Sequence, residues 1–329
     1  MENISRKFLL FYVSAMLCMA PMALHAASKK TQKQITTGSN YKTVKYKSGS
    51  RKIHHRIRAH KAVAVDSYDG TTPLRLASAK AIVINQLTGE TLYAKNTNVP
   101  TPIASVTKLM TAMVMLDANL SLDELLSIGD QDVDYLKGTS SRLSVGTTLT
   151  RGELLQLALM ASENRAASAL GRHYPGGKPA FIQAMNNKAQ LLGMQSTHFV
   201  DSTGLDSNNV STAEDLVKMV NAAYHYPEIR QVSTLPSQEV TLYGRQNPLN
   251  FVNTNALVRG GNWIIGLSKT GFINEAGRCL VMQAEISGQP TIIVLLDSAG
   301  KMTRIGDANR IRKWVERNDV NSLGDHVHG

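Results

Sequence analysis

Cysteine is scarce in this chain of 329 residues, and neither of its two cysteines points to a disulfide or a nucleophile. Cys18 lies in an apolar N-terminal run after Met16 and Leu17, where a lipid-attachment site would need small residues, so we interpret it as an apolar filler. Cys279 begins the strand-like stretch CLVMQAEI. We therefore expect no internal disulfide and a buried, unreactive thiol at Cys279.

Long apolar runs are also missing. The run at residues 8–20 is too short to cross a bilayer, which takes about 20 residues. It follows two basic residues and is closed by Pro21. This pattern predicts a secretory signal peptide over residues 1–26, and the mature protein is expected to be exported to the periplasm.

Acidic residues are absent from residues 27–62, which contain eleven Lys or Arg, whereas the chain after residue 62 holds 23 basic and 24 acidic residues. The net charge of +11 is therefore concentrated in one segment. Without apolar periodicity, this segment predicts a basic disordered arm or linker over residues 27–76. In an exported protein such an arm would meet an anionic membrane or wall surface, so no nucleic acid partner is expected, and a plain solvated spacer is the alternative.

Metal-ligand spacing is lacking as well. The histidines of the presumed folded region, His173, His198 and His225, show no paired spacing of the kind that metal sites use. We expect them to be structural residues, and we expect neither a metal ion nor another cofactor.

The rest of the chain has the pattern of one folded domain, expected over residues 77–318, with a short tail over residues 319–329. Strand-like stretches stand at both of its ends. The first is AIVINQLTGETLYAKN, a predicted hairpin that turns at Gly89, and the later ones are NWIIGLSKTGF, RCLVMQAEI and TIIVLLDS.

Helical patterns fill the middle and the end of this domain. Capping boxes are predicted at Thr150 with Glu153 and at Ser211 with Glu214, PAFIQAMNNKAQLLGM is a further helix, and RIGDANRIRKWVERN is the last one. Strand pairs on either side of a helical middle predict an α+β fold in which the terminal strands share one antiparallel sheet.

A lysine stands in an otherwise apolar helical run, PIASVTKLMTAMVML. Ser105 and Lys108 are three residues apart near the predicted start of this helix, so their side chains can touch. Burial and the positive end of the helix both disfavour the ammonium form of Lys108. A neutral lysine could act as a base for the Ser105 hydroxyl, whereas a serine cap and a lysine that reaches water are the ordinary alternatives.

Two further polar triplets follow in the chain. Ser162-Glu163-Asn164 interrupts a helical stretch, and Lys269-Thr270-Gly271 stands at the end of an apolar strand, just before Phe272. Either triplet alone could simply be a helix cap or part of a sheet edge. Together they occur in the order S-x-x-K, S-x-N, K-T-G, which is the signature of serine penicillin-binding proteins and β-lactamases.

The region from about residue 77 to 317 resembles the low-molecular-mass D-alanyl-D-alanine peptidases, most closely the D-Ala-D-Ala endopeptidases of the penicillin-binding protein 7/8 type. The resemblance extends over TPIASVTKLMTAMVMLDA, LALMASENRAASALGRHYPGG, AFIQAMNNKAQLLGM, STAEDL, NTNALV and SKTGFINEAGRCLVM. It implies a DD-peptidase/β-lactamase-like fold, an antiparallel sheet flanked by helices with a helical subdomain and the active site between them. It also implies peptidoglycan stem peptides as substrates and β-lactam antibiotics as acylating ligands.

The resemblance implies catalytic roles for three residues. Ser105 would be the nucleophile on a D-alanine carbonyl, Lys108 the base that takes its proton, and Ser162 a relay, with Lys108, toward the departing amine.

Substrate binding is implied for residues of the other triplets. Asn164 would hold a peptide group of the stem, while Lys269, Thr270 and Gly271 would receive the carboxylate end. The backbone N–H groups of Ser105 and Phe272 would form the oxyanion hole. We assign no catalytic role to Glu163, whose carboxylate is expected to lie in the first turn of a helix and favour the helix N-terminus.

Three other functions are compatible with parts of this pattern. A D-Ala-D-Ala carboxypeptidase uses the same acyl-enzyme, and we favour the endopeptidase from the closer resemblance and from the short stretch after Gly271, which leaves no space for a further β-domain and membrane anchor. A β-lactamase is disfavoured because no E-x-x-x-N-type stretch follows SEN. A non-catalytic wall-binding or β-lactam-binding module is disfavoured by the intact Ser105, Lys108 and Lys269.

Overall fold

The computed structural model describes residues 73–242 and 247–325, with side chains through residue 318. The predicted signal peptide and the predicted arm up to residue 72 lie outside these residues. Within the described ranges, no helix is both long and apolar enough to cross a membrane.

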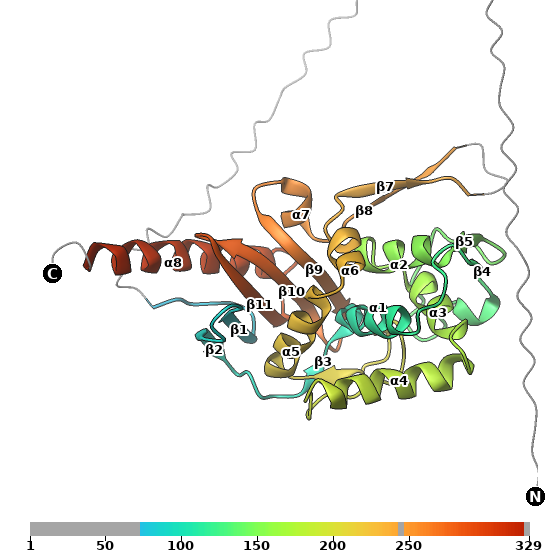
Figure 1. Ribbon diagram of the computed structural model, residues 1–329, viewed down its shortest axis with the longest axis horizontal. Coiled ribbons are helices and arrows are strands. Elements are labelled where there is room, and N and C mark those ends of the chain that lie inside the picture. Colours follow the sequence, from blue (N-terminus) through green and yellow to red (C-terminus); the bar gives the residue numbers. More distant parts are fainter. Residues whose placement is uncertain (1–72, 243–246, 326–329) are drawn as a thin grey trace, which may run out of the picture. The chain divides into compact units, whose positions relative to one another are not determined.

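A five-stranded antiparallel sheet forms one layer of the domain, with the strand order β2-β1-β11-β10-β9 (Figure 1). Its strands are β1 (Lys80–Asn85), β2 (Thr91–Lys95), β9 (Ile264–Ile273), β10 (Gly277–Ile286) and β11 (Gln289–Ser298). The first and last strands are neighbours, with Lys80 opposite Leu296. The predicted hairpin and the predicted α+β fold with its terminal strands in one antiparallel sheet are therefore confirmed.

Both faces of the sheet are buried because successive side chains of a strand point to opposite sides. In β10, Val281 belongs to the larger core beneath the helices, whereas Leu280 and Met282 pack in a second core with Ala308 and Ile311. The last two belong to α8 (Thr303–Asp325), which covers one face of the sheet (Figure 1).

The other helices are α1 (Lys108–Asp117), α2 (Arg151–Met160), α3 (Asn164–Arg172), α4 (Gly177–Leu191), α5 (Ala213–Tyr224), α6 (Pro227–Ser233) and α7 (Ala256–Gly260). The helices α5 and α6 pack against the other face of the sheet, and α2, α3 and α4 surround α1, whereas Leu257 of α7 belongs to the second core on the α8 side. Short elements connect the helices: β3 (Thr101–Pro102) with β6 (Val210–Ser211), β4 (Leu125–Ser127) with β5 (Thr148–Thr150), β7 (Ser237–Val240) with β8 (Leu249–Val252), and the 3₁₀ turns η1 (Ala104–Thr107) and η2 (Asp130–Asp132).

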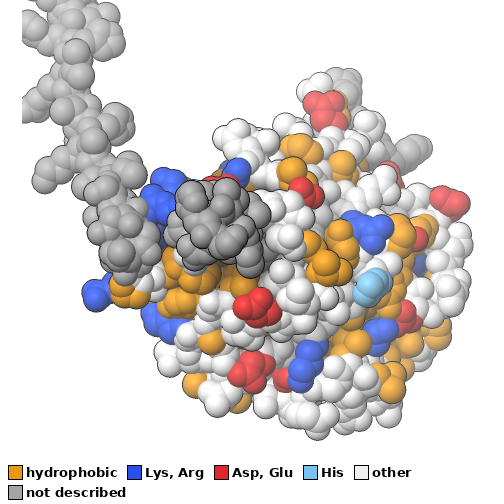
Figure 2. Space-filling view, turned by 60° about the vertical axis from the view of Figure 1, so that its left-hand side comes forward, with side chains coloured by type: hydrophobic (Ala, Val, Ile, Leu, Met, Phe, Trp, Pro, Cys, Tyr) orange, Lys and Arg blue, Asp and Glu red, His pale blue; other side chains and the backbone are white. Residues whose placement is uncertain are grey.

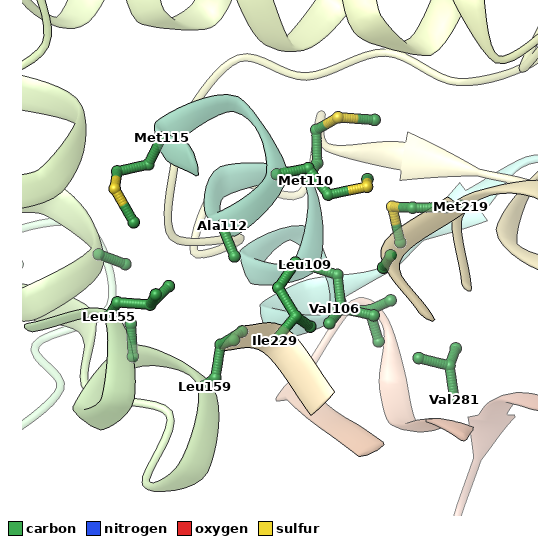
Figure 3. Packing of buried hydrophobic residues seen from close by; sticks show 14 of the residues in the cluster. Val106, Leu109, Met110, Ala112, Met115, Leu155, Leu159, Met219, Ile229 and Val281 are labelled. Atoms are coloured by element: carbon green, nitrogen blue, oxygen red, sulfur yellow. The ribbon is translucent and has the colours of Figure 1, made fainter. Parts of the chain in front are cut away.

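The helix α1 lies at the centre of the larger core. Its residues from Lys108 to Met115 are all buried, so its apolar side chains pack on every side. Figure 3 shows Leu109 between Leu159 of α2, Ile229 of α6 and the neighbouring Val106. A helix that is surrounded in this way is held rigidly, and the turn η1 that precedes it packs against β9.

The capping predictions gave one correct and one wrong result. Thr150 caps α2 as predicted, since its Oγ1 accepts a hydrogen bond from the N–H of Glu153 and the Glu153 carboxylate accepts one from the N–H of Thr150. The second cap was predicted at Ser211, but the structure has Thr212 in that role. Ser211 is instead part of β6, so the chain is still extended there and the helix begins one residue later.

The ends of the domain also differ from the sequence-based bounds. Leu74 and Leu76, which the prediction assigned to the arm, are buried in the core beside α8, so the packed region starts before residue 77. At the other end α8 continues through Asp325, into the predicted tail. On the face that Figure 2 shows, acidic and basic side chains are interspersed, in agreement with the nearly neutral sequence after residue 62.

Candidate active site

Ser105 and Lys108 lie together, but on a different turn from the one predicted. The sequence suggested a single helix, whereas Ser105 is in the 3₁₀ turn η1 and Lys108 is the first residue of α1. The turn begins at Ala104, whose φ of 48° is unusual for a residue with a Cβ and marks a strained backbone. The predicted contact is present, with the Lys108 Nζ 2.8 Å from the Ser105 Oγ.

Two glycines make space for this strained turn. At Gly204, whose φ is +80°, an added Cβ would lie 1.9 Å from the Ala104 carbonyl oxygen and 2.9 Å from the Ser105 nitrogen. At Gly271 a Cβ would lie 2.9 Å from the Ile103 oxygen. Only glycine lets both segments approach the backbone that carries Ser105.

Lys108 is fully buried, and three oxygen atoms surround its amine. Besides Ser105, its Nζ bonds the Asn164 Oδ1 at 2.7 Å and the Thr203 carbonyl oxygen at 2.7 Å. Two of these atoms can only accept, whereas the Ser105 hydroxyl can also donate. A neutral amine that donates its two hydrogens to the carbonyl groups must therefore direct its lone pair at the Ser105 hydroxyl.

The charge on Lys108 is easily lost. Burial lowers the pKa of Lys108 from 10.5 to about 7, and the carboxylates of Asp201 and Glu163 oppose part of this effect. The lysine can thus be neutral near neutral pH, which is the state that a proton acceptor needs.

The triplet Ser162-Glu163-Asn164 joins α2 to α3. Ser162 has a φ of 60°, and its Oγ accepts a hydrogen bond from Lys269 Nζ at 2.9 Å. The Lys108 amine itself hydrogen-bonds Ser105, Asn164 and Thr203, so the relay from Ser162 with Lys108 stays a prediction.

The neighbours of Ser162 are held by a loop that precedes α2. Asn164 donates through its Nδ2 to the Thr139 Oγ1 at 3.0 Å, and Glu163 accepts from the Ser141 Oγ at 2.6 Å. The contact with Thr139 fixes the amide orientation that leaves the Asn164 oxygen for Lys108. The contact with Ser141 is one that the sequence did not reveal for Glu163.

Lys269 reaches the same place from β9. Its Nζ donates to Ser162 and to the Thr270 carbonyl oxygen at 2.8 Å, and the Thr270 hydroxyl donates to the Thr254 Oγ1 at 2.7 Å. Burial lowers the pKa of Lys269 well below its usual value, and the positive charges of Lys108 and Arg304 act in the same direction. A bound anion would oppose both effects.

Arg304 of α8 adds a third cation beside the end of β9. Its Nη1 donates to the Gly271 carbonyl oxygen at 2.9 Å and to the Cys279 carbonyl oxygen at 3.0 Å, while its buried Nε has no partner among the described residues. Phe272, the next residue of β9, is 49% exposed and stacks under Arg278. The strand end is therefore positively charged and partly open to solvent.

The matching family model spans residues 66–300 and describes D-alanyl-D-alanine carboxypeptidases. This chain belongs to that family, the S11 peptidases. It is 48% identical over 248 residues to a D-alanyl-D-alanine endopeptidase of Pseudomonas aeruginosa, covering 75% of this chain and 80% of the relative. It is 47% identical over 245 residues to a D-alanyl-D-alanine endopeptidase of Escherichia coli, covering 74% and 79%.

Solved structures give the same result. The crystal structure of a Streptomyces DD-transpeptidase matches with a TM-score of 0.69 at 31% identity, covering 74% of this chain and 98% of the other. A D-alanyl-D-alanine carboxypeptidase of Mycobacterium tuberculosis matches with a TM-score of 0.66 at 28% identity, covering 75% and 94%. The predicted family and the predicted DD-peptidase-like fold are confirmed.

A cavity of about 270 Å³ opens beside the two carbonyl groups that hold Lys108 in this S11 peptidase. Its lining includes Asn164 and Thr203, together with the apolar side chains of Leu136, Phe181 and Val200. The site therefore has open space next to the residues that hold Lys108.

Sequence reasoning missed several residues that complete the S11 site. The Thr203 carbonyl, Gly204, Thr254 and Arg304 belong to none of the three motifs, and their contacts with the site arise only from the fold.

Two further predictions concern thiols and metals. Cys279 is buried as predicted, and burial raises its pKa to about 11, which agrees with the expected unreactive thiol. Over residues 73–242 and 247–325, no cluster of three or more His, Cys, Asp or Glu side chains could hold a metal ion.

Proposed function

We propose that this protein is a serine DD-peptidase that cleaves peptide bonds after D-alanine in peptidoglycan, with Ser105 as the nucleophile. The observation that carries this proposal is the buried Lys108 amine, whose carbonyl partners leave its lone pair directed at the Ser105 hydroxyl. In the first step Lys108 takes the hydroxyl proton while the Ser105 Oγ bonds to the D-alanine carbonyl carbon. The names of the relatives support this reaction class.

Collapse of the tetrahedral intermediate breaks the C–N bond, and the departing amine needs a proton. The Ser162 hydroxyl, which accepts a hydrogen bond from Lys269, can donate its own proton toward that nitrogen. Ser162 regains a proton from the Lys108 ammonium, as in the relay suggested by the sequence, so Lys108 is neutral again, while the hydrogen bond from Lys269 orients the Ser162 hydroxyl. Water then attacks the acyl carbon with neutral Lys108 as base, and Lys108 passes that proton to the departing Ser105 oxygen, which restores both residues.

The oxyanion would be stabilised by the backbone N–H groups of Ser105 and Phe272. The proximity of β9 to the Ser105 backbone, measured at Gly271, supports this assignment. A donor of this kind contributes about 3 kcal/mol to the transition state in serine hydrolases.

Substrate would bind between β9 and the Ser162–Asn164 turn. We expect the Asn164 amide and the Thr270 hydroxyl to contact the peptide, and Gly271 keeps the strand close to the nucleophile. Lys269 and Arg304 supply positive charge for a substrate carboxylate, whose arrival would favour the ammonium form of Lys269.

Penicillin provides the direct test of the nucleophile. Intact-mass analysis should show one covalent adduct in the wild-type protein and none in Ser105→Ala. An adduct that persists in Ser105→Ala would contradict the assignment of the nucleophile.

We further propose that the protein is an endopeptidase that cuts D-Ala cross-links, with a D-Ala-D-Ala carboxypeptidase as the alternative. Two endopeptidases at 47–48% identity support the first, and carboxypeptidases among the more distant relatives keep the second open. Chromatography of purified wall fragments separates them. Conversion of cross-linked dimers to monomers, absent in Ser105→Ala, is expected, whereas loss of one alanine from pentapeptide monomers with intact dimers would identify a carboxypeptidase.

The location of the protein and the role of its arm rest on sequence alone. We propose that residues 1–26 direct export to the periplasm and that residues 27–62 bind anionic membrane or wall surfaces through their eleven positive charges. Sedimentation with anionic vesicles should bring down the protein with the arm at low salt and release it at high salt. Equal sedimentation after deletion of residues 27–62 would leave only a spacer role.

A further inference from the structure

The loop from Asp201 to Asp206 contacts the catalytic centre, although it belongs to none of the three motifs. The Thr203 carbonyl accepts from the Lys108 Nζ at 2.7 Å, and the Ser202 carbonyl accepts from the Thr111 Oγ1 of α1 at 2.7 Å. Gly204 lies against the Ala104 carbonyl. One short loop therefore holds both the nucleophile turn and the lysine beside it.

The Asp201 carboxylate organises this loop. Its Oδ1 accepts hydrogen bonds from the backbone N–H groups of Thr203 and Gly204, both at 2.5 Å, and from the Thr203 hydroxyl at 3.0 Å. Its Oδ2 accepts from the N–H of Asp206 at 2.7 Å. The conformation that aims the Thr203 carbonyl at Lys108 is thus built around a single carboxylate.

We propose that Asp201 is a positioning residue for acyl transfer: it fixes the Thr203 carbonyl that orients the Lys108 amine, and its negative charge controls how readily Lys108 gives up its proton. This inference rests on the proposed role of Lys108 as the base for Ser105.

Three charged groups from other elements act on the pair Lys108 and Lys269. Asp201, from its loop, and Glu163, just before α3, favour the charged form of Lys108, against the effect of burial. Lys269 of β9 hydrogen-bonds the Ser162 hydroxyl, and Arg304 of α8 disfavours the charged form of Lys269. Of the two carboxylates, Asp201 has the larger effect on the pKa of Lys108. It also holds in place Thr203, whose carbonyl accepts from Lys108.

The two parts of this role have separable consequences. Loss of the negative charge lowers the proton affinity of Lys108, so the rising limb of the rate against pH should move to lower pH. Loss of the loop geometry misdirects the Lys108 lone pair, so the plateau rate should fall. A purely structural role would lower the plateau without moving the limb.

The experiment measures the second-order rate of acylation by a fluorescent penicillin from pH 5 to 9 in the full chain. For Asp201→Asn we expect the rising limb of the acylation rate to lie at a pH lower by about half a unit or more. We expect the plateau rate to fall about tenfold or more. Asp206→Asn is the matched control, because it removes a carboxylate from the same loop that caps only the N–H of Asn208. It should leave both quantities unchanged.

Two further variants keep the test decisive. Asp201→Ser retains a hydrogen-bond acceptor for the turn and replaces Asp201→Asn if that variant does not fold by near-ultraviolet circular dichroism. Asp201→Glu restores the charge on a longer side chain, so its limb should return toward the wild-type position while its plateau stays low.

The outcomes distinguish this inference from the proposed function. If the limb of folded Asp201→Asn or Asp201→Ser coincides with that of the wild type, the electrostatic role of Asp201 is refuted. An unchanged plateau refutes its positioning role. If the wild-type protein itself is not acylated, the proposed function fails first.

Discussion

Replacing Gly204 by alanine tests whether the close approach of two backbones sustains the active site. The added Cβ would lie 1.9 Å from the Ala104 oxygen and 2.3 Å from the Ala104 carbonyl carbon, distances at which the backbone must move. The positive φ of +80° adds strain, because alanine disfavours that region.

The magnitude follows from these two terms. A left-handed conformation costs a residue with a Cβ about 1–2 kcal/mol, and overpacking of a rigid region costs about 1–3 kcal/mol. We therefore expect Gly204→Ala to reduce the free energy of unfolding by about 2–5 kcal/mol, a fall in Tm of about 5–15 °C for a domain of this size. The displaced Ala104–Ser105 backbone should also slow acylation by penicillin about tenfold or more, since small misplacements of a nucleophile are costly.

Gly193→Ala is the matched control for Gly204→Ala. Gly193 has a similar φ of +70°, but an added Cβ there would meet nothing within 4 Å. It should show only the conformational cost, with a Tm lower by a few degrees and a wild-type rate of acylation. The reasoning is refuted if Gly204→Ala melts and acylates as Gly193→Ala does.

Three other predictions concern single charged side chains. Lys269→Ala should weaken capture of substrates and drugs that carry a carboxylate more than it affects a neutral acyl donor, measured as KM against kcat for the two kinds of donor. Asp132 is penalised by burial, but hydrogen bonds, first of all from Arg172, outweigh this and lower its pKa. Its contribution to stability is therefore present above its unfolded pKa and lost as pH falls through the folded pKa, so urea unfolding of Asp132→Asn should depend less on pH below about pH 4 than that of the wild type. Asp307→Asn should cost about 2–4 kcal/mol in the same assay near neutral pH, because the buried Asp307 carboxylate accepts from the N–H and the hydroxyl of Ser78; a loss under 1 kcal/mol would contradict this.

Much of the fold could be predicted because its patterns are local. The strands β10 and β11 each contain a continuous apolar run, and the start of α2 is indicated by Thr150 and Glu153. The terminal sheet followed from strand-like stretches on either side of a helical middle. The error at Ser211 shows the limit, since a serine or threonine pattern indicates a cap only to within a residue when the preceding segment pairs as a strand.

The candidate site was predictable where it depends on side-chain chemistry and not where it depends on the backbone. A lysine in an apolar run is conspicuous in sequence, and its contact with Ser105 follows from spacing alone. The Thr203 carbonyl is 95 residues from Lys108 and has no side-chain signature, because every residue carries a carbonyl group. Arg304 likewise sits on an ordinary helix, and only the packing of α8 against β10 brings it to the end of β9.

The two buried lysines of this site differ through their neighbours. Both lose proton affinity by burial, but Lys108 is near the carboxylates of Asp201 and Glu163, whereas Lys269 is near the cations Lys108 and Arg304. Lys108 therefore titrates near neutral pH, and the lone pair that it exposes on deprotonation points to a hydroxyl. Lys269 has no carboxylate among the influences on its pKa, so its ammonium form is the one that an arriving anion stabilises. In the proposed function, a proton acceptor and an anion-binding group are thus made from the same residue type within one site, because the placement of carboxylates around each lysine favours one role or the other.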